Sequence, residues 1–596
     1  MEKLKRYFYH LLWYSIPLSM ISCKSLVTVN AEIKDQPIAQ VSLDEYANVQ
    51  KRKDAIYQDP DLALGLSISG GGSRAEYYGL GVLMGLEELA LQKDSVVNLT
   101  STGTANKRNF LNDVDYFSTV SGGGFAGGYY LGARKNNLIA PGQSLRAFWL
   151  SRDEVYKTNI PYNAKVGNLF TNYKKYEKDK KHPSFPDMVD EVILQKGNKD
   201  LSGKPINSLV LNDFFAKKGE QATMPMFVPS GTIYNNSERI PFMPHIISQM
   251  KILKSEMPRQ DLSGDPYNDG FTLPLKYAIA ASSGFPGLVP QVKLKVAYKR
   301  YEKDTKDYYV RIIDGGVVDN LGFTTLVELL KYDNAADNKK RALIIDCSGE
   351  GLVERYAPNK LGQVSLLKHS LMFTLQSKYA TFDRDIVTLM KWAGIPDPEN
   401  SYLKIGITDL RAIAQAIRDE ADSLSDEART INSELLRIKN NPKLTKRYED
   451  ELKELRHSLD SMETQELFTD ATLRSSQVLD SLRRDEGKRL TKKQKQKRWN
   501  DFYEMFERML DNRIQDYNLV LDDYPGKHHN MDLLKTADFA KFKENDKALL
   551  LLLYELASQV DTNVELPSDR ERSILILAGR YTVFVRRDKI LDLYAN

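Results

Sequence analysis

The sequence predicts an α/β domain with a mixed sheet followed by a helical region, and three observations support this. Short β-rich segments alternate with helical stretches from about residue 60 to 405, which is typical of layered α/β domains. The segments KLKVAYKRY and DYYVRIID resemble the two strands of a hairpin, which would add an antiparallel pair to the sheet. Beyond residue 408, apolar residues recur in steps of three and four, which is a helical period.

The strands of the α/β domain are predicted at short segments rich in β-branched and aromatic residues. A helix is predicted after the first of them, in YYGLGVLMGLEELAL (77–91), and another in TTLVELL after the fifth. Helices between several of the strands are typical of a layered α/β domain. The strands are predicted over 62–69, 115–120, 225–234, 292–298, 308–314 and 342–346.

The helical region contains two apolar stripes separated by Asn440-Asn441-Pro442, which interrupts the pattern. We therefore predict an αα-hairpin with charged outer faces and nearly heptad, coiled-coil-like spacing. Segment 548–557 is too short to span a bilayer and is predicted to be a buried helix, whereas 571–585 fits a helix or a strand. The two stripes are Leu410, Ile413, Ile417, Ala421, Leu424, Ala428, Ile431, Leu435 and Ile438, and then Leu444, Tyr448, Leu452, Leu455, Leu459 and Met462.

Composition and charge exclude several classes of protein. The chain has 596 residues and a formal net charge of +4 from 84 basic and 80 acidic residues, which argues against a dedicated nucleic-acid binder. The basic run at 490–498 is expected to be a solvated linker. Two cysteines cannot form a disulfide framework, and no Cys/His spacing predicts a metal site. Cys347 follows a predicted strand and is expected to be buried.

The N-terminus has the pattern of a secretory signal peptide. A positive segment with Lys3, Lys5 and Arg6 precedes a short apolar stretch, which is followed by the small residue Ser22 before Cys23. The sequence Met20-Ile21-Ser22-Cys23 resembles a bacterial lipoprotein cleavage box, which implies cleavage before Cys23 and lipidation of that residue. An ordinary signal peptide followed by an unrelated cysteine is the alternative.

The stretch DYFSTVSGGGFAGGYYLG (115–132) predicts a sharp strand-to-helix turn at Ser121. Such a turn projects a serine hydroxyl out of the sheet, as in a nucleophile elbow, and it requires small residues two positions before and after the serine. These positions hold Thr119 and Gly123. A helix that starts beneath the serine also directs its dipole towards an anion formed there. The alternative is a glycine-rich turn with an incidental serine.

A second glycine-rich turn lies in LSISGGGSRAEYYGLG (66–81), where a strand ends in Gly70, Gly71 and Gly72. Glycines allow backbone N–H groups to converge on an anion at a helix N-terminus. The sequence lacks the Gly-Lys-Ser/Thr of a Walker loop and the G-x-G-x-x-G spacing of a dinucleotide loop. The remaining candidate anion is the oxyanion of an acyl-transfer intermediate. Arg74 is expected to orient this loop or to be a surface cation.

A third turn lies in RIIDGGVVDNLG (311–322), where a strand delivers Asp314 to two glycines. Taken alone it predicts an ordinary Asp-Gly turn. Asp319 is predicted to cap the following helix or to form the turn before it.

Together the three turns resemble the patatin-like phospholipases. The family's oxyanion loop (Gly-Gly-Gly-x-Arg-Gly), elbow (Gly-x-Ser-x-Gly) and catalytic aspartate (Asp-Gly-Gly) correspond to 70–75, 119–123 and 314–316, with Ala75 and Thr119 in place of glycine. Segment 278–290 resembles the family's small-residue helix that runs to a proline. The resemblance covers about 60–350 and implies a three-layer α/β/α sandwich with a mixed central sheet.

The resemblance also implies an activity. The family uses a serine–aspartate dyad without histidine, so Asp314 would take the proton of Ser121, and the loop Gly70, Gly71, Gly72, Ser73 and Arg74 would form the oxyanion hole. The chain is then a lipid acyl hydrolase of the phospholipase A or lysophospholipase type that needs no metal or cofactor. The alternatives are an inactive scaffold that binds a partner protein through its helical hairpin, and a nucleotide-binding protein.

The predicted organisation follows from these assignments. A signal peptide (1–22) and a tether (23–58) precede the α/β domain (59–407), a helical region (408–525) and a C-terminal region that packs on the core (526–596). The mature protein is expected to be a lipoprotein of the cell envelope, held by its lipid anchor on the outer membrane or a periplasmic face. Its expected partners are an acyl-lipid substrate, the membrane and a protein bound by helices 408–525.

Overall fold

The computed structural model of the chain describes residues 61–89, 109–140, 143–149, 185–216, 224–250, 272–286, 289, 291–296, 308–347, 385–410, 554, 557 and 569–595. These residues form a mixed eight-stranded sheet with helices on both faces. The strands are β1 (Ala63–Ile68), β2 (Val114–Thr119), β3 (Met226–Ile233), β4 (Glu238–Pro241), β5 (Val292–Val296), β6 (Tyr308–Asp314), β7 (Lys340–Asp346) and β8 (Tyr402–Gly406).

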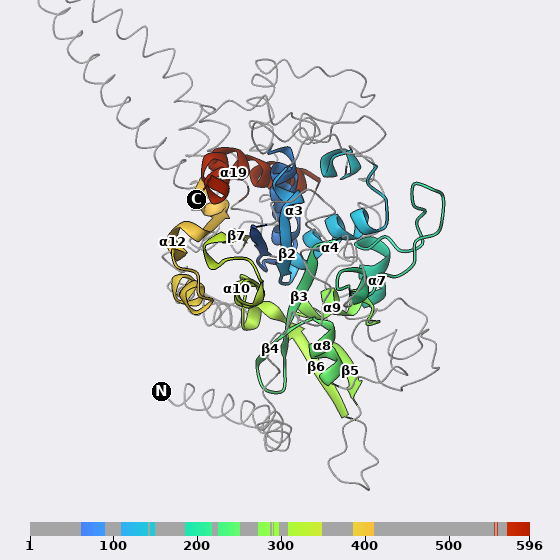
Figure 1. The fold of residues 1–596 in the computed structure, drawn as a ribbon. Helices are drawn as coiled ribbons and strands as arrows, with labels where there is room; N and C mark the ends of the chain where they lie inside the picture. The colour runs from blue at the N-terminus through green and yellow to red at the C-terminus, as the bar shows by residue number, and fades with distance from the viewer. Residues whose placement is uncertain are drawn as a thin grey trace, which may run out of the picture.

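The strand order is β5-β6-β3-β2-β1-β7-β8, with β4 paired to β3 outside this path. β1, β2, β7, β8 and the first half of β3 run parallel. The second half of β3 pairs antiparallel with β4 and β6, and β5 pairs antiparallel with β6. The predicted mixed sheet and the predicted hairpin are both confirmed, and the two-stranded ribbon of β5 and β6 projects from the body in Figure 1.

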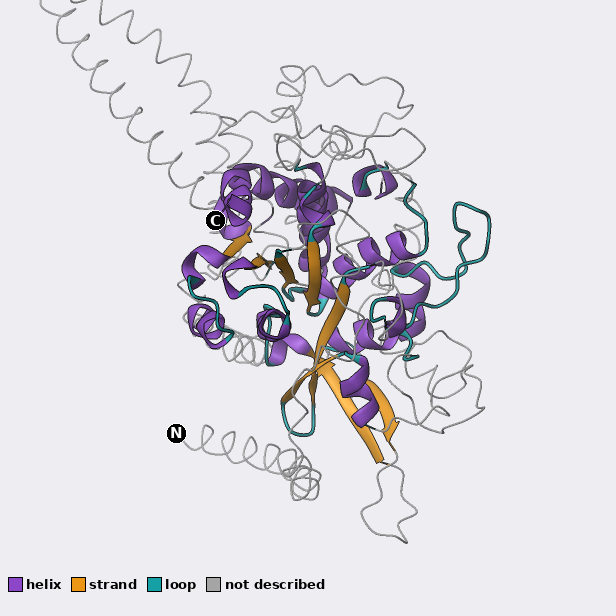
Figure 2. Ribbon diagram, viewed as in Figure 1, coloured by secondary structure: helices purple, strands orange, loops and turns teal. Residues whose placement is uncertain are grey.

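The helices cover the two faces of the sheet in separate layers. On one face, Gly79 of α3 packs against Ile68 of β1 and Ala126 of α4, and Ile279 of α9 lies against Gly128 of α4. On the other face, Leu326 of α10 packs against Gly65 of β1. This is the predicted three-layer arrangement (Figure 2). The helices are α3 (Gly72–Glu88), α4 (Gly122–Lys135), α7 (Phe185–Val192), α8 (Pro244–Gln249), α9 (Leu275–Ser282), α10 (Phe323–Tyr332), α12 (Pro398–Ser401) and α19 (Asp569–Ala595).

The segment 571–585, for which the sequence left helix and strand open, belongs to the helix α19. It lies along α3 in Figure 1, and the two helices approach closely because Gly579 faces the Tyr78 carbonyl and Gly81 faces the backbone of Ile576. The buried Arg580 guanidinium donates to the Glu88 carboxylate at 3.0 Å. Glycines at this crossing remove the side chains that would keep the two backbones apart.

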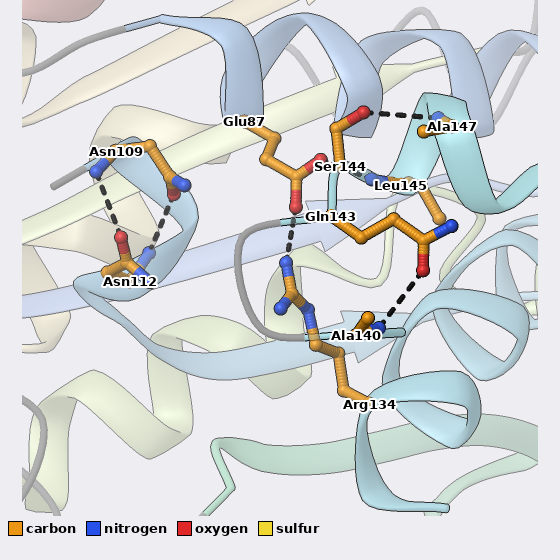
Figure 3. A network of polar contacts seen from close by, with 9 residues as sticks. All are labelled: Glu87, Asn109, Asn112, Arg134, Ala140, Gln143, Ser144, Leu145 and Ala147. Carbon is orange, nitrogen blue, oxygen red and sulfur yellow. Dashed lines mark hydrogen bonds and ion pairs between the residues drawn. The ribbon is translucent and has the colours of Figure 1, made fainter. Parts of the chain in front are cut away.

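A polar network joins the end of α3 to α4 and to the segment that follows α4 (Figure 3). The Glu87 carboxylate accepts from the Arg134 guanidinium of α4 and from the backbone N–H of Leu145. Burial raises the pKa of Glu87, against the opposing effect of Arg134. The network therefore fixes α3 against α4, the two helices whose N-termini begin at the glycine-rich turns.

Several sequence predictions lie outside the described residues. They are the signal peptide, Cys23, the tether and the αα-hairpin, of which the structure describes only the first residues up to Leu410. In the described part of the chain, no helix combines the length and the apolar character needed to cross a membrane.

Candidate active site

The turn after β2 has the geometry of a nucleophile elbow. β2 ends at Thr119, α4 begins at Gly122, and Ser121 between them has φ 52 and ψ −126. A positive φ is strained for a residue with a side chain, and such strain is common at functional sites. A Cβ on Gly123 would lie within 2.6 Å of the Ser69 carbonyl oxygen, so the small residue required after the serine is present for a steric reason.

Thr119 departs from the family's glycine without distorting the elbow. It pairs in register with Ile68 of β1 and Pro229 of β3, and it is not among the described residues of positive φ. The strained backbone falls on Ser121 instead. A residue with a side chain is therefore tolerated at position 119, because that position is ordinary strand.

The register of β3 explains why Asp314 reaches Ser121 across 193 positions of sequence. Thr119, the last residue of β2, lies opposite Pro229 of β3, whereas Asp314, the last residue of β6, lies opposite Gly231. β3 continues beyond β2, and β6 returns antiparallel along that extension. The two strand ends therefore face each other across β3, and Ser121 comes two residues after Thr119.

The two side chains form a direct hydrogen bond. The Ser121 hydroxyl donates to Asp314 Oδ2 at 2.7 Å, and the Gly316 N–H donates to Asp314 Oδ1 at 2.7 Å. Asp314 is 3% exposed and Ser121 8% exposed. Burial raises the pKa of Asp314 to about 6, and the bonds from Ser121 and Gly316 act in the opposite direction. A carboxylate with this pKa is a stronger base than an exposed aspartate.

Two serines of the segment 278–290 hold the backbone of Ser121. Ser282 Oγ accepts from the Ser121 N–H at 3.0 Å and donates to the Ser230 carbonyl at 2.6 Å. Ser283 Oγ donates to the Ser121 carbonyl at 3.2 Å. Our sequence analysis identified this segment as a family resemblance but assigned these serines no role. Two adjacent serines directly after a helix of small residues were the feature of the sequence that could have suggested this role.

The glycine loop lies beside the dyad. A Cβ on Gly70 would lie 3.2 Å from the Cβ of Ser121, and Gly71 has φ 150, a conformation that favours glycine. α3 begins at Gly72, so its positive N-terminal end lies at this loop. No described residue accepts a hydrogen bond from the N–H groups of Gly71 or Gly72, which leaves both available to an anion.

The structure corrects the donor role that the sequence predicted for Gly70 in the oxyanion hole. Its N–H donates to the Asn320 carbonyl at 2.9 Å, so it is already engaged and is not a free donor. The role of Gly70 is steric, because any side chain there would overlap the Asn320 carboxamide and crowd Ser121. Sequence alone could not show this, because the acceptor is 250 residues away.

Arg74 is buried, which excludes the surface cation that was the alternative for this residue. Its Nε donates to the Cys347 carbonyl at 3.3 Å, and the Cys347 N–H donates to Ser69 Oγ at 2.8 Å. These bonds tie the start of α3 to the end of β7. Arg74 therefore orients the loop through backbone contacts, with Ser73 buried beside it. Cys347 is buried as predicted.

Asn320 is a site residue that our sequence analysis did not identify. Its Oδ1 lies close to two glycines: a Cβ added to Gly316 would be 2.7 Å from this oxygen, and a Cβ added to Gly70 would be 2.4 Å from it. The carboxamide thus lies between the glycine loop and the turn of Asp314, and its backbone holds Gly70. The preceding Asp319 accepts from the Thr324 N–H at 3.0 Å, which confirms its predicted role at the start of α10.

Among the described residues, no group of three His, Cys, Asp or Glu side chains gathers where a metal ion could be held. The functional side chains lie at the ends of β1, β2 and β6. Ligand sites of open α/β sheets lie outside the carboxyl ends of parallel strands, and β1 and β2 obey this rule. The fold and the site therefore define an α/β protein with a glycine-rich loop next to a serine that is hydrogen-bonded to a buried carboxylate.

Residues 66–327 match the family model described as patatin-like phospholipase. The matched residues include all three glycine-rich turns, with Ser121 and Asp314 among them, so the similarity to this family of lipid acyl hydrolases covers the candidate site. No curated protein matches the chain as a relative.

Two solved structures are similar to the chain. One is human GIVD cytosolic phospholipase A2 in complex with methyl gamma-linolenyl fluorophosphonate inhibitor and terbium chloride, with 15% identity and a TM-score of 0.25 over 55% of this chain and 46% of that one. The other is human GIVD cytosolic phospholipase A2, with 12% identity and a TM-score of 0.27 over 50% of this chain and 48% of that one. The chain thus spans about half the length of each.

Proposed function

We propose that this chain hydrolyses carboxylic esters of lipids, as a phospholipase A or lysophospholipase, through a dyad of Ser121 and Asp314. The observation that carries the proposal is the 2.7 Å hydrogen bond from the Ser121 hydroxyl to the buried Asp314 carboxylate, on a backbone held at positive φ. A serine merely incidental to a glycine-rich turn needs neither a buried base nor this strained conformation.

In the first half of the reaction, Ser121 Oγ attacks the ester carbonyl carbon while Asp314 Oδ2 takes the hydroxyl proton. The C–O bond to the alcohol then breaks, and Asp314 returns the proton to the leaving alkoxide. An acyl-enzyme on Ser121 remains. In the second half, Asp314 takes a proton from water, the hydroxide attacks the acyl carbonyl, and Ser121 leaves with the proton from Asp314.

The negative charge of each tetrahedral intermediate falls beside the start of α3. The N–H groups of Gly71 and Gly72 are the proposed donors, supported by the N-terminal dipoles of α3 and α4. Donors placed in advance of the reaction need no reorganisation, and loss of one such donor typically costs about 10²–10³-fold in rate. Charge stabilisation at this position reduces the basicity that Asp314 must supply.

An activity-based experiment tests this function. We expect a fluorophosphonate probe to label the purified protein at Ser121, and we expect release of fatty acid from a panel of defined phospholipids and lysophospholipids. Ser121→Ala should lose both, whereas Ser118→Ala, a substitution in the same strand that faces Gly322, should still be labelled. Absence of labelling in a folded wild-type protein would instead favour the inactive scaffold that binds a partner through helices 408–525.

We also propose that Cys23 carries a lipid that tethers the mature protein to a membrane of the cell envelope. The support is the positively charged start, the apolar stretch and the small residue Ser22 before Cys23. Mass spectrometry of the N-terminal peptide should find acylation at Cys23, and Cys23→Ala should release the protein from the membrane fraction. An unmodified Cys23 in membrane-bound protein would contradict this proposal.

A further inference from the structure

The projecting ribbon of β5 and β6 exposes one face that the described helices do not cover. Four side chains, Tyr234, Lys293, Tyr309 and Arg311, are exposed there and are called the hairpin patch below. Along β6 the exposed residues alternate with buried ones such as Ile312. This alternation is that of a sheet with one face in the core and one in water.

The register places the four side chains next to one another. Lys293 pairs with Arg311 between β5 and β6, and the Tyr234 N–H donates to the Arg311 carbonyl at 2.8 Å. Directly opposed residues of neighbouring strands point to the same face. The Lys293 ammonium lies 5.2 Å from the centre of the Tyr309 ring. The patch is therefore a compact mixture of two cations and two aromatic rings.

Helix α10 covers the same face of the sheet only nearer the core. Thr325 of α10 bonds to Ser230 Oγ at 2.9 Å and to the Arg239 guanidinium. Beyond this contact, Tyr234 is 44% exposed and Tyr309 38% exposed, two of the four large apolar side chains that are exposed among the described residues. Large aromatic groups gathered in water indicate a binding surface more often than scattered ones do.

The charge of this part of the chain restricts the partner. No described acidic side chain forms an ion pair with Lys293 or Arg311. The sequence from 292 to 311 contains seven lysines and arginines, three acidic residues and four tyrosines. Its excess of positive charge equals the formal net charge of the entire chain, which is +4. Lys293 and Arg311 thus belong to a segment of positive net charge, which favours an anionic partner.

We propose that the hairpin patch docks the protein on the surface of an anionic phospholipid membrane. Lysine and arginine are attracted to anionic headgroups within a Debye length, and tyrosine rings favour the interface between water and hydrocarbon. The inference rests on the proposed function, because a lipid hydrolase meets its substrate at such a surface. Arg311 is three residues before Asp314 on β6, about 10 Å along the strand, so docking would bring the membrane near the dyad.

Vesicle flotation with the full-length Ser121→Ala protein tests the proposal without hydrolysis of the lipid. Binding is measured to phosphatidylcholine vesicles and to vesicles that also contain phosphatidylglycerol, and the ratio of the two partition coefficients is compared. In this ratio, any contribution from apolar segments that bind both kinds of vesicle equally cancels. Lys293→Glu with Arg311→Glu should lower the ratio about tenfold or more, and high salt should lower the wild-type ratio.

A control variant makes the same change in net charge at two positions outside the hairpin patch. Lys391 and Lys589 are exposed lysines on other elements, so Lys391→Glu with Lys589→Glu should leave the ratio unchanged. An equal fall in both double variants, or an unchanged ratio in the patch variant, would overturn the proposal. So would patch-dependent binding of a single-stranded RNA without any preference for anionic vesicles.

Failure of the docking proposal can be separated from failure of the proposed function. With Ser121 intact, the patch variant should keep its melting temperature, its labelling by a fluorophosphonate probe and its hydrolysis of a water-soluble short-chain ester. It should lose activity only on anionic vesicles. Absence of labelling in both proteins would refute the hydrolase function, while the flotation result would still decide the docking proposal.

Discussion

The parallel and antiparallel halves of the sheet differ in how they are covered and in what they contribute. Strands β1, β2 and β7 are buried on both faces, between α3 and α4 on one side and α10 on the other. The ribbon of β5 and β6 is covered on one face and exposed on the other. The parallel half provides Ser121 and the glycine loop, whereas the antiparallel half provides Asp314 and the hairpin patch.

The comparison shows that the candidate site is assembled where the two halves meet. β3 belongs to both halves, because its first part pairs with β2 and its second part with β6. Two contacts fix this junction: Gly315 packs directly on the Ser230 carbonyl, and Ser282 bonds both to Ser230 and to the Ser121 N–H. The alignment of serine and aspartate therefore depends on β3.

The largest expected effect comes from removal of one member of the dyad from either half. Ser121→Ala and Asp314→Asn should each reduce kcat for ester hydrolysis by at least ~10³-fold. Because the two groups act as a unit, the double variant should be no slower than the single ones. Steady-state kinetics of the three variants on a soluble ester measures this. Additive losses would indicate two independent roles.

The junction itself is expected to tolerate no added methyl group at Gly315. A Cβ there would overlap the backbone oxygen of Ser230, which cannot rotate away, so Gly315→Ala should lower the free energy of unfolding by about 2–4 kcal/mol. Gly316→Ala is the matched control, since its Cβ would meet the movable end of Asn320 at 2.7 Å. Denaturant unfolding measures the stability of the two variants. Equal stability of Gly315→Ala and Gly316→Ala would show that the contact of Gly315 with the Ser230 carbonyl is not a tight constraint.

Ser282 should matter more for catalysis than its neighbour Ser283. Ser282→Ala removes the acceptor of the Ser121 N–H and the bond across the junction, so kcat and the rate of fluorophosphonate labelling should fall about 10–100-fold with little change in KM. Ser283→Ala removes a longer bond, of 3.2 Å, and should cost less than about fivefold. Equal effects would show that Ser282 has no special positioning role.

Near neutral pH, where Asp314 is ionised, the smallest effect is the dependence of activity on pH. As the proposed base, Asp314 must be ionised, and its pKa is about 6, so kcat/KM should fall about tenfold per pH unit below pH 6 and level off above it. A rate profile on a neutral soluble ester measures this. A plateau that extends down to pH 4 would show that Asp314 is not the base.

The free energy of unfolding should change with pH in the opposite direction to the activity. The folded state holds the Asp314 proton more tightly than the unfolded chain, so the free energy of unfolding should decrease as pH rises from about 4 to 6 and then stay low. The change from 3.8 to about 6 corresponds to about 3 kcal/mol. Asp314→Asn should therefore be more stable than the wild type at pH 8 and nearly equal at pH 4.

Much of the α/β domain was predictable because its signals are local. The strands at 62–69, 115–120 and 308–314 are apolar segments bounded by turns, and the structure contains β1, β2 and β6 there. The strands β4 and β8 were not predicted. β4 is only four residues long and contains charged residues and proline, and β8 has partly exposed residues that weaken its pattern.

The site was predictable in its motifs but not in its contacts. Glycines around Ser121 and after Asp314 mark places where backbones approach closely, and such marks are visible in sequence. The contacts of Ser282 and Asn320 depend on the register of strands far apart in the chain, which no local pattern encodes. Gly70 was assigned as an anion donor for the same reason, since its acceptor is Asn320.

The long contact between α3 and α19 has a consequence for biosynthesis. α3 begins at the glycine loop. Along its length α3 packs against Gly579 of α19, and its Glu88 forms an ion pair with Arg580 of α19. During translation, α19 leaves the ribosome long after Ser121 and Asp314 have done so. We therefore expect α3, and the glycine loop at its start, to be incompletely packed in a nascent chain that stops before Asp569.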